Sequence, residues 1–189
     1  NVVSMTTSVE NAFGSRLVAQ GFVLNNQLTD FAFVPTEGDR AVANRVQPGK
    51  RPRSSMAPVV VFDRATGAPL AAVGSPGGSR IIGYVAGALV GLLDGGLPPD
   101  EAVRLPHVVN RNGPTEVEAR GWDPGAREAL VAALEAKGHE VRVTSMTSGL
   151  HAIARPAPDA PWRGGADPRR EGEPVSVGAP AADLDAALQ

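Results

Sequence analysis

Apolar and hydroxyl-bearing residues alternate along residues 2–9, which is the period of a half-buried β-strand. A second short apolar run, at residues 21–24, ends at a pair of asparagines and also predicts a strand. The runs at 58–63 and 69–73 flank a glycine-containing turn, so we expect these two runs to pair as a β-hairpin. The polar residues between these strands, at 36–50, contain proline and glycine and indicate a loop.

The longest apolar stretch of the chain follows a glycine-rich turn at residues 74–79. It predicts a helix over residues 80–93 that is apolar on nearly every side and is therefore buried. Later elements are expected as a short helix near 99–105, a strand at 115–119, an amphipathic helix at 124–137 ending at Gly138, and closing strands at 141–143 and 150–154.

The order of these elements, with strands before and after a buried helix, is typical of an α+β fold. We expect a largely antiparallel sheet with helices on at least one face. Residues 1–170 are predicted to form one domain, and residues 171–189 a C-terminal tail in which 181–188 forms a last helical turn.

Composition narrows the range of functions. The hydrophobic share of 42% is enough for a core, and a net charge of −2 without a long charged run argues against nucleic acid or an anionic membrane as partner. The chain has no cysteine, so disulfides and thiol chemistry are excluded. The apolar stretch at 81–93 is too short to span a bilayer. The three histidines are scattered, so we predict no metal site and no cofactor.

Three segments carry residue types that suit catalysis or binding. Ser54 and Ser55 lie between prolines just before a predicted strand, where they can face a ligand carboxylate or cap their own turn. Gly77 and Gly78 open the apolar helix, where their N–H groups can form an oxyanion hole or only a tight turn. Asp30, in an amide-rich segment, can pair with an ammonium group or belong to an Asx-turn loop.

Read in order, the segments resemble the light subunit of the gamma-glutamyltranspeptidase family. The segments that carry the resemblance are TTSVENAFGS at 6–15, LNNQLTDF at 24–31, PGKRPRSSMAP at 48–58 and GSPGGSRII at 74–82. EAVRLPHVVN at 101–110 and GGADPRR at 164–170 are also similar to that family. The resemblance runs from residue 1 to about residue 170.

The resemblance implies part of an N-terminal-nucleophile hydrolase fold, an αββα sandwich, produced by autoprocessing of a precursor. In that family the new N-terminal threonine attacks a gamma-glutamyl amide, as in glutathione, with its own amino group as base. The acyl-enzyme then passes to water or to the amine of an amino acid or peptide. The implied partner is the heavy subunit of the same precursor.

The resemblance also assigns roles to residues of this chain. Gly77 and Gly78 match the oxyanion-hole glycines, and Ser8 matches a hydroxyl that hydrogen-bonds the nucleophile. Residues that bind the substrate are implied at five positions. The pair of serines is implied to hold the alpha-carboxylate of the gamma-glutamyl group, and the other three residues are implied to lie at its alpha-ammonium. These positions are Ser54, Ser55, Asp30, Glu10 and Gln27.

The chain departs from the family pattern at its beginning. Only seven residues precede Ser8, so we expect the nucleophilic threonine to be missing from this chain and the chain alone to be inactive. Two alternatives stay open: an amidase similar to cephalosporin acylases, and a non-catalytic relic. A bacterial source with a periplasmic or extracellular location is compatible with the family, as is a cytoplasmic one.

Overall fold

The computed structural model describes residues 1–176 of the chain. The chain divides into two compact units. Residues 1–6 and 56 onward form the larger unit, here called the α/β unit, and residues 7–55 form the hairpin unit. The prediction of one domain over residues 1–170 stays a prediction. The helical turn predicted at 181–188, and the tail beyond residue 176, lie outside the described residues.

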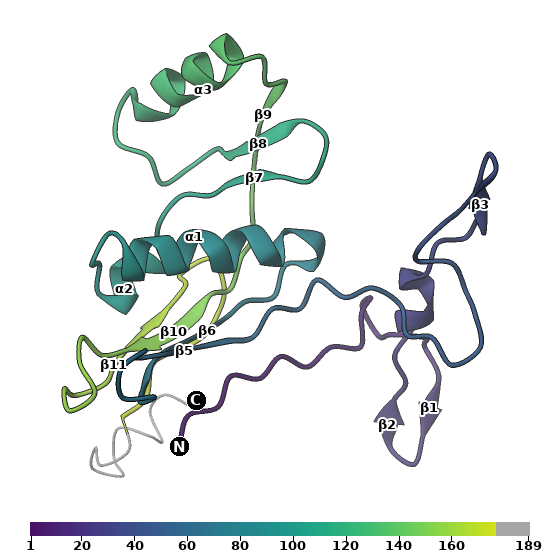
Figure 1. Ribbon diagram of the computed structural model, residues 1–189, viewed down its shortest axis with the longest axis horizontal. Helices are drawn as coiled ribbons and strands as arrows, with labels where there is room; N and C mark the ends of the chain where they lie inside the picture. The colour runs from purple at the N-terminus through teal and green to yellow at the C-terminus, as the bar shows by residue number, and fades with distance from the viewer. Residues whose placement is uncertain (177–189) are drawn as a thin grey trace. The chain divides into compact units, whose positions relative to one another are not determined.

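The α/β unit contains a four-stranded antiparallel sheet in the order β11-β10-β6-β5 (Figure 1). The strands are β5 (Val59–Phe62), β6 (Pro69–Gly74), β10 (His151–Ala154) and β11 (Arg163–Ala166). The predicted hairpin of β5 and β6 is confirmed. Its turn is held by the Asp63 carboxylate, which accepts hydrogen bonds from the backbone N–H and the hydroxyl of Thr66 at 2.7 Å each. Strand β11 was not predicted.

A second sheet of the same unit has three strands, β7 (Val108–Asn110), β8 (Thr115–Glu118) and β9 (Val141–Thr144). Strands β7 and β8 are antiparallel, whereas β8 and β9 are parallel because the helix α3 (Ala126–Ala136) lies between them in the chain. The helix predicted at 124–137 is confirmed. Gly138, with φ +86°, provides its left-handed C-terminal position.

Helix α1 (Ile81–Leu93) contacts both sheets, through β6 on one side and β7 on the other, and the short helix α2 (Pro99–Ala102) lies against β11 (Figure 1). Gly165 of β11 allows this approach, because a Cβ there would lie 2.5 Å from the backbone of α2. The core forms where α1 meets the large sheet. Its most buried side chains include Tyr84, Leu150 and Val73.

The prediction that the helix at 80–93 is buried on all sides is wrong for one face. Residues such as Ile81 and Val85 face the core, but Ile82, Val90 and Leu93 are 59%, 57% and 54% exposed. These three residues, at spacings that return to the same side of a helix, form what we call the α1 apolar stripe. The two sheets cover only part of the circumference of α1, so the stripe is left in contact with solvent.

The strand predicted at residues 2–9 is not formed either. This segment pairs with no strand within residues 1–176, although the burial of its first residues alternates as a strand's would. Val2, Ser4 and Thr6 are half-buried, and the Ser4 hydroxyl donates to the carbonyl of Val73 at 3.1 Å. Val3 and Met5 point to solvent. The sequence therefore has the pattern of a strand, but a partner strand is lacking.

The hairpin unit has little hydrophobic core. Its elements are β1 (Val18–Ala19), β2 (Phe22–Val23), the 3-10 helix η1 (Gln27–Asp30), β3 (Thr36–Glu37) and β4 (Arg40–Ala41). The predicted strand at 21–24 is confirmed as β2. The predicted loop at 36–50 begins with the short β3–β4 hairpin instead. Phe31 is the one buried side chain between residues 7 and 55.

A buried polar network joins the two sheets of the α/β unit. His107 Nε2 lies 2.7 Å from the Ser148 hydroxyl, which in turn donates to Asp167. Arg169 forms ion pairs with both Asp167 and Glu118, and the Glu118 carboxylate accepts the backbone N–H of His107 at 2.9 Å. All five side chains are largely buried. The network therefore connects β8, the segment before β7, and the segments that flank β10 and β11.

We expect the stability of the α/β unit to depend on pH through His107. Burial, followed by the nearby Arg169 guanidinium, lowers the pKa of His107 from 6.5 to about 4, although Glu118 and Asp167 oppose the change. The unfolded chain therefore binds more protons between these values, and stability falls as the pH drops from 6.5 to 4. The loss reaches at most about 3 kcal/mol for this one group.

Urea unfolding across that pH range, on the parent chain and on His107→Gln, measures this effect. The free energy of unfolding of the variant should change less with pH, because glutamine does not titrate. If the free energies of unfolding of the two proteins changed in parallel with pH, His107 would bind a proton equally well in the folded and unfolded states. That result would contradict the prediction.

Candidate functional site

The residues at 75–78, here called the diglycine turn, place two N–H groups at the start of a helix. Gly77 is the N-cap of the 3-10 helix η2 (Gly78–Arg80), and Gly78 is its first residue. This helix continues directly into α1. Within residues 1–176, neither the N–H of Gly77 nor that of Gly78 donates to a hydrogen bond. Two adjacent free N–H groups before a helix are suited to hold an anion or a developing oxyanion.

Glycine is required at the first of these positions. Gly77 has φ +137°, in a region that other residues rarely adopt, and Gly78 has φ +59°. A Cβ at Gly77 would lie 2.6 Å from Cε2 of Tyr84, whereas a Cβ at Gly78 would meet nothing within 4 Å. The ring of Tyr84 therefore packs directly against the backbone of the turn.

Three of the predicted site residues lie together in the hairpin unit. The hydroxyl of Ser8 accepts the N–H of Glu10 at 2.8 Å, and the side-chain amide of Gln27 donates to the Ser8 carbonyl at 3.2 Å. Asn26 joins this group, because its side-chain amide donates to the Glu10 carboxylate. Glu10 has φ +72°, which is uncommon for a residue with a side chain. The result is a small polar cluster with an exposed carboxylate.

Asp30 ends the 3-10 helix that begins at Gln27. Its side chain is half-buried, and within residues 1–176 its carboxylate makes no hydrogen bond or ion pair. An acceptor held in place without a donor of its own is available for a ligand cation.

Asn44 links Asp30 to the serine pair, and it was not identified from the sequence. Its side-chain amide donates to the carbonyl of Asp30 at 2.6 Å, and its side-chain oxygen accepts the N–H of Arg53 at 3.0 Å. Arg53 directly precedes Ser54 and Ser55. The side-chain amide of Asn44 therefore holds the backbone at Asp30 and the backbone next to Ser54 and Ser55. An isolated asparagine in a polar loop gives no sequence signal for such a role.

The predicted site residues thus fall into two sets. The hairpin unit holds the residues assigned to substrate binding together with Ser8, and the α/β unit holds Gly77 and Gly78. The roles that the resemblance implies for the two sets concern one gamma-glutamyl substrate, and a single pocket formed by both sets stays a proposal.

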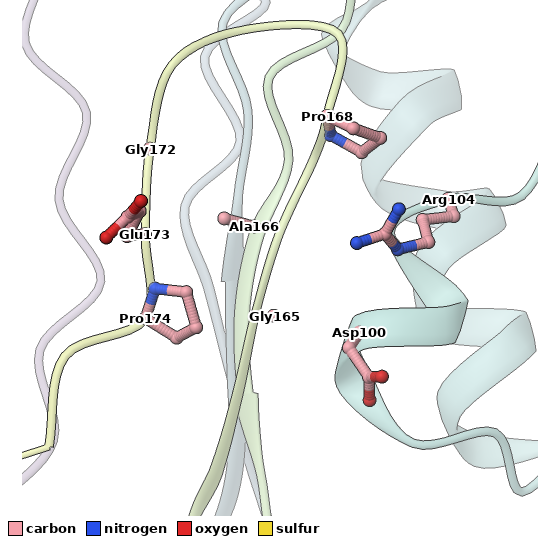
Figure 2. A pocket seen from close by; sticks show the side chains of 8 residues that line it. All are labelled: Asp100, Arg104, Gly165, Ala166, Pro168, Gly172, Glu173 and Pro174. Atoms are coloured by element: carbon pink, nitrogen blue, oxygen red, sulfur yellow. The ribbon is translucent and has the colours of Figure 1, made fainter.

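The α/β unit also has a shallow pocket of about 360 Å³ that contains none of the predicted site residues. Figure 2 shows Asp100 and Arg104, from α2 and the turn after it, on one wall, with Glu173 and Pro174 on the segment opposite. Charges of both signs line it. The pocket therefore shows no preference for a ligand of one charge.

Among residues 1–176 there is no group of three or more histidine, aspartate or glutamate side chains that could hold a metal ion. Over the same residues, no helix has the length and apolar character needed to cross a membrane.

Comparison with known proteins connects these features to one family. A family model described as gamma-glutamyltranspeptidase matches residues 1–177. The chain is 36% identical over 180 residues to the glutathione hydrolase proenzyme of Escherichia coli, covering 89% of this chain and 29% of that protein. It is 35% identical over 180 residues to the acylase ACY 1 proenzyme of a Pseudomonas species, covering 94% of this chain and 30% of that protein.

Among solved structures, a mutant of gamma-glutamyltranspeptidase from Helicobacter pylori is similar, with a TM-score of 0.76 and 28% identity. The match covers 90% of this chain and 94% of that one. The predicted fold class, a partial α+β fold of the N-terminal-nucleophile hydrolase type, is thereby confirmed. The chain spans about 30% of the length of the curated relatives it matches. The matches over nearly all of its length show that the chain belongs to the gamma-glutamyltranspeptidase family.

Proposed function

We propose that this chain is the light-subunit part of an enzyme that hydrolyses or transfers gamma-glutamyl groups of glutathione and related amides. The observation that carries the proposal is the free carboxylate of Asp30, which ends the 3-10 helix whose first residue, Gln27, belongs to the cluster with Ser8 and Glu10. Carboxylates gathered with amide oxygens suit the alpha-ammonium of a gamma-glutamyl group, because each can accept one of its N–H donors.

In the proposed reaction, the hydroxyl of an N-terminal threonine outside this chain attacks the gamma-carbonyl carbon. The C–N bond of the amide breaks, the leaving amine takes up a proton, and an ester forms on the threonine. The N–H groups of Gly77 and Gly78 stabilise the oxyanion that develops on the carbonyl oxygen, a contribution of about 3–4 kcal/mol for one good donor. Water or an amine then attacks the ester and releases the enzyme.

The other side chains are proposed to hold the donor substrate in place. The hydroxyls of Ser54 and Ser55 donate to its alpha-carboxylate, and Asp30, Glu10 and Gln27 accept from its alpha-ammonium. Ser8 hydrogen-bonds the nucleophile. In this arrangement residues 1–170 act as one light-subunit-like domain, followed by a tail at 171–189.

The proposed partner is the heavy subunit of the same precursor. Curated relatives are proenzymes more than three times as long as this chain. The α1 apolar stripe and the outward side chains of Val3 and Met5 leave apolar surface exposed in the α/β unit, as a missing partner would. An upstream reading frame that encodes a threonine start and a further domain would support the partner, and its absence would favour the relic.

A second candidate is an amidase similar to the acylase relative, which is 35% identical to this chain. Its name specifies an acylase but not a substrate. If the acyl group were glutaryl, it would lack the alpha-ammonium that the Asp30 carboxylate is proposed to bind. The two candidates therefore differ in what they require of Asp30.

Replacing Asp30 by asparagine separates these candidates. In the proposed longer protein that contains this chain, Asp30→Asn should lower kcat/KM for a gamma-glutamyl anilide by about 10- to 150-fold, the value of a lost charged hydrogen bond of about 1.5–3 kcal/mol. Turnover of the glutaryl anilide should stay within about twofold, because that substrate has no ammonium group.

Asp39→Asn is the matched control, since Asp39 is an exposed carboxylate in the same unit. An equal loss on both anilides would mean that Asp30 acts on folding and not on the ammonium. A preference of the parent protein for the glutaryl anilide would support the acylase instead. The 189-residue chain alone should turn over neither substrate, because the nucleophile is proposed to lie outside it.

A further inference from the structure

Three buried polar side chains of the α/β unit have no part in the proposed substrate contacts. His107 is 5% exposed, Asp167 2% and Ser148 0%, and they come from distant parts of the chain. Burial raises the pKa of Asp167, but hydrogen bonds from Ser148 and Arg169 outweigh it and keep the pKa below its ordinary value. Asp167 is therefore ionised and can only accept hydrogen bonds.

This ionisation fixes the direction of the hydrogen bonds. The single hydroxyl proton of Ser148 goes to Asp167, so the Nε2–H of His107 is the donor in the 2.7 Å contact with Ser148. In a catalytic triad the histidine lies between the serine and the carboxylate and takes the serine proton. Here the serine lies in the middle and has no exposed surface, so it is not a nucleophile.

One route leads from this group to the diglycine turn through an aromatic contact. The ring of His107 packs on the ring of Tyr84, with centroids 4.3 Å apart. Tyr84 is 1% exposed, and its ring edge is the surface that a Cβ at Gly77 would strike at 2.6 Å. The position of His107 therefore limits where Tyr84, and then Gly77, can lie.

A second route runs through the backbone next to Ser148. Asp167 also accepts the N–H of Leu150 at 3.3 Å, so it holds the segment 148–150 at both ends. Between them, the N–H of Gly149 donates to the Ser75 hydroxyl at 3.3 Å, and that hydroxyl donates to the Pro76 carbonyl at 2.7 Å. Ser75 is itself buried and is the first residue of the diglycine turn.

Gly149 must be glycine for this contact. A Cβ there would lie 2.8 Å from the ring of Pro76 and 2.7 Å from the side chain of Arg170. The segment 148–150 is therefore in van der Waals contact with the diglycine turn, in addition to the hydrogen bond through Ser75.

We propose that Ser148, held between His107 and Asp167, is a positioning residue that sets the direction of the Gly77 and Gly78 N–H groups. It acts by both routes, through Tyr84 on one side of the turn and through Gly149 and Ser75 on the other. The catalytic consequence rests on the proposed function, in which these two N–H groups form the oxyanion hole.

The direction of the two N–H groups can be measured without any substrate. In the ¹⁵N-labelled 189-residue chain, Ser148→Ala should shift the Gly77 and Gly78 amide resonances and change their residual dipolar couplings, while the Gly67 amide in the β5–β6 turn stays unchanged. Thr147→Ala removes an exposed hydroxyl one residue away and should leave all three amides as in the parent.

Tyr84→Leu gives an independent measurement if Ser148→Ala does not fold. It removes the ring on Gly77 and should perturb the same two amides, whereas Tyr84→Phe keeps the ring and should not. If a folded Ser148→Ala protein kept the parent couplings at Gly77 and Gly78, the inference would be overturned. The same holds if Tyr84→Leu left both amides unmoved.

The catalytic consequence is tested separately in the longer protein. Ser148→Ala should lower kcat for a gamma-glutamyl anilide by about 10- to 100-fold with KM within twofold, because misplaced donors weaken the transition state more than substrate binding. If Ser148→Ala changes the couplings but the longer parent protein does not turn over the gamma-glutamyl anilide, the proposed function is overturned and the positioning role of Ser148 is supported. Changed couplings with an unchanged kcat would overturn the link between Ser148 and catalysis.

Discussion

In the proposed longer enzyme, replacing Gly77 by alanine is expected to lower kcat for a gamma-glutamyl anilide by about 10²- to 10³-fold, the usual effect of losing one oxyanion donor. Two physical costs act on the same residue. Alanine at φ +137° is strained by about 1–3 kcal/mol, and its Cβ would lie 2.6 Å from Cε2 of Tyr84. Since Tyr84 is buried against His107, the ring cannot move away, and the turn must change instead.

Two other glycines provide controls for Gly77→Ala. Gly67, at φ +69°, has open space around it in the β5–β6 turn, so Gly67→Ala reports the cost of backbone strain away from the candidate site. Gly78→Ala adds a Cβ in open space at φ +59° and should be the milder change of the two in the diglycine turn. Values of kcat for all three variants, with urea unfolding of each, separate catalysis from stability. A kcat for Gly77→Ala within twofold of the parent would remove the diglycine turn from the mechanism.

Local patterns predicted the elements whose signals lie within a few residues. The β5–β6 hairpin and the turn into α1 were found because a glycine-containing turn between two apolar runs, and adjacent glycines before a helix, need no distant partner. The helix at 124–137 was found in the same way, from its periodicity and from Gly138. Strand β11 was missed because Gly164 and Gly165 have no strand propensity, and the reasons for glycine there are distant neighbours, α2 at Gly165 and Pro174 at Gly164.

The burial of α1 could not be derived from its composition. A helix that is apolar all round fits both a central position in one chain and a position between two subunits, and the sequence does not distinguish them. The α1 apolar stripe is the part of the helix that the described residues do not cover. Residues 2–9 present the same ambiguity, since a strand pattern specifies the faces of a strand but not its partner.

The candidate site shows a similar limit. The candidate site residues were named from the order of short segments, but the residues that hold them in place were not. Asn44 lies 14 residues from Asp30 and 9 residues from Arg53, the two residues that it connects. Ser148 lies 41 residues from His107 and 19 residues from Asp167. Contacts at such separations leave no periodic trace in a single sequence.

The largest expected loss of stability follows from removing the guanidinium at the centre of the buried network. Arg169 donates to both carboxylate oxygens of Glu118, at 2.7 and 2.9 Å, and to Asp167 at 3.0 Å. Its remaining donors reach the carbonyls of Leu105 and Val103. Arg169→Met leaves two buried carboxylates without their cation and should cost about 3–5 kcal/mol in urea unfolding.

Neighbouring substitutions distinguish charge from volume in this result. Arg170→Met removes an exposed guanidinium from the adjacent position, where it donates only to backbone carbonyls, and should cost less than about 1 kcal/mol. Arg169→Lys keeps a positive charge but loses the two-point contact with Glu118, so its stability should lie between those of the parent and Arg169→Met.

The pH dependence of Arg169→Met provides a further check on the cause. Without the guanidinium, the buried Asp167 carboxylate loses one of the contacts that keep its pKa low, so its pKa in the folded variant should be higher than in the folded parent. The folded variant then binds more protons than the folded parent at acidic pH, and its loss of stability should shrink as the pH falls. A gap between parent and variant that stays constant from neutral to acidic pH would mean that the loss comes from packing around Arg169, and not from the unpaired charges of Glu118 and Asp167.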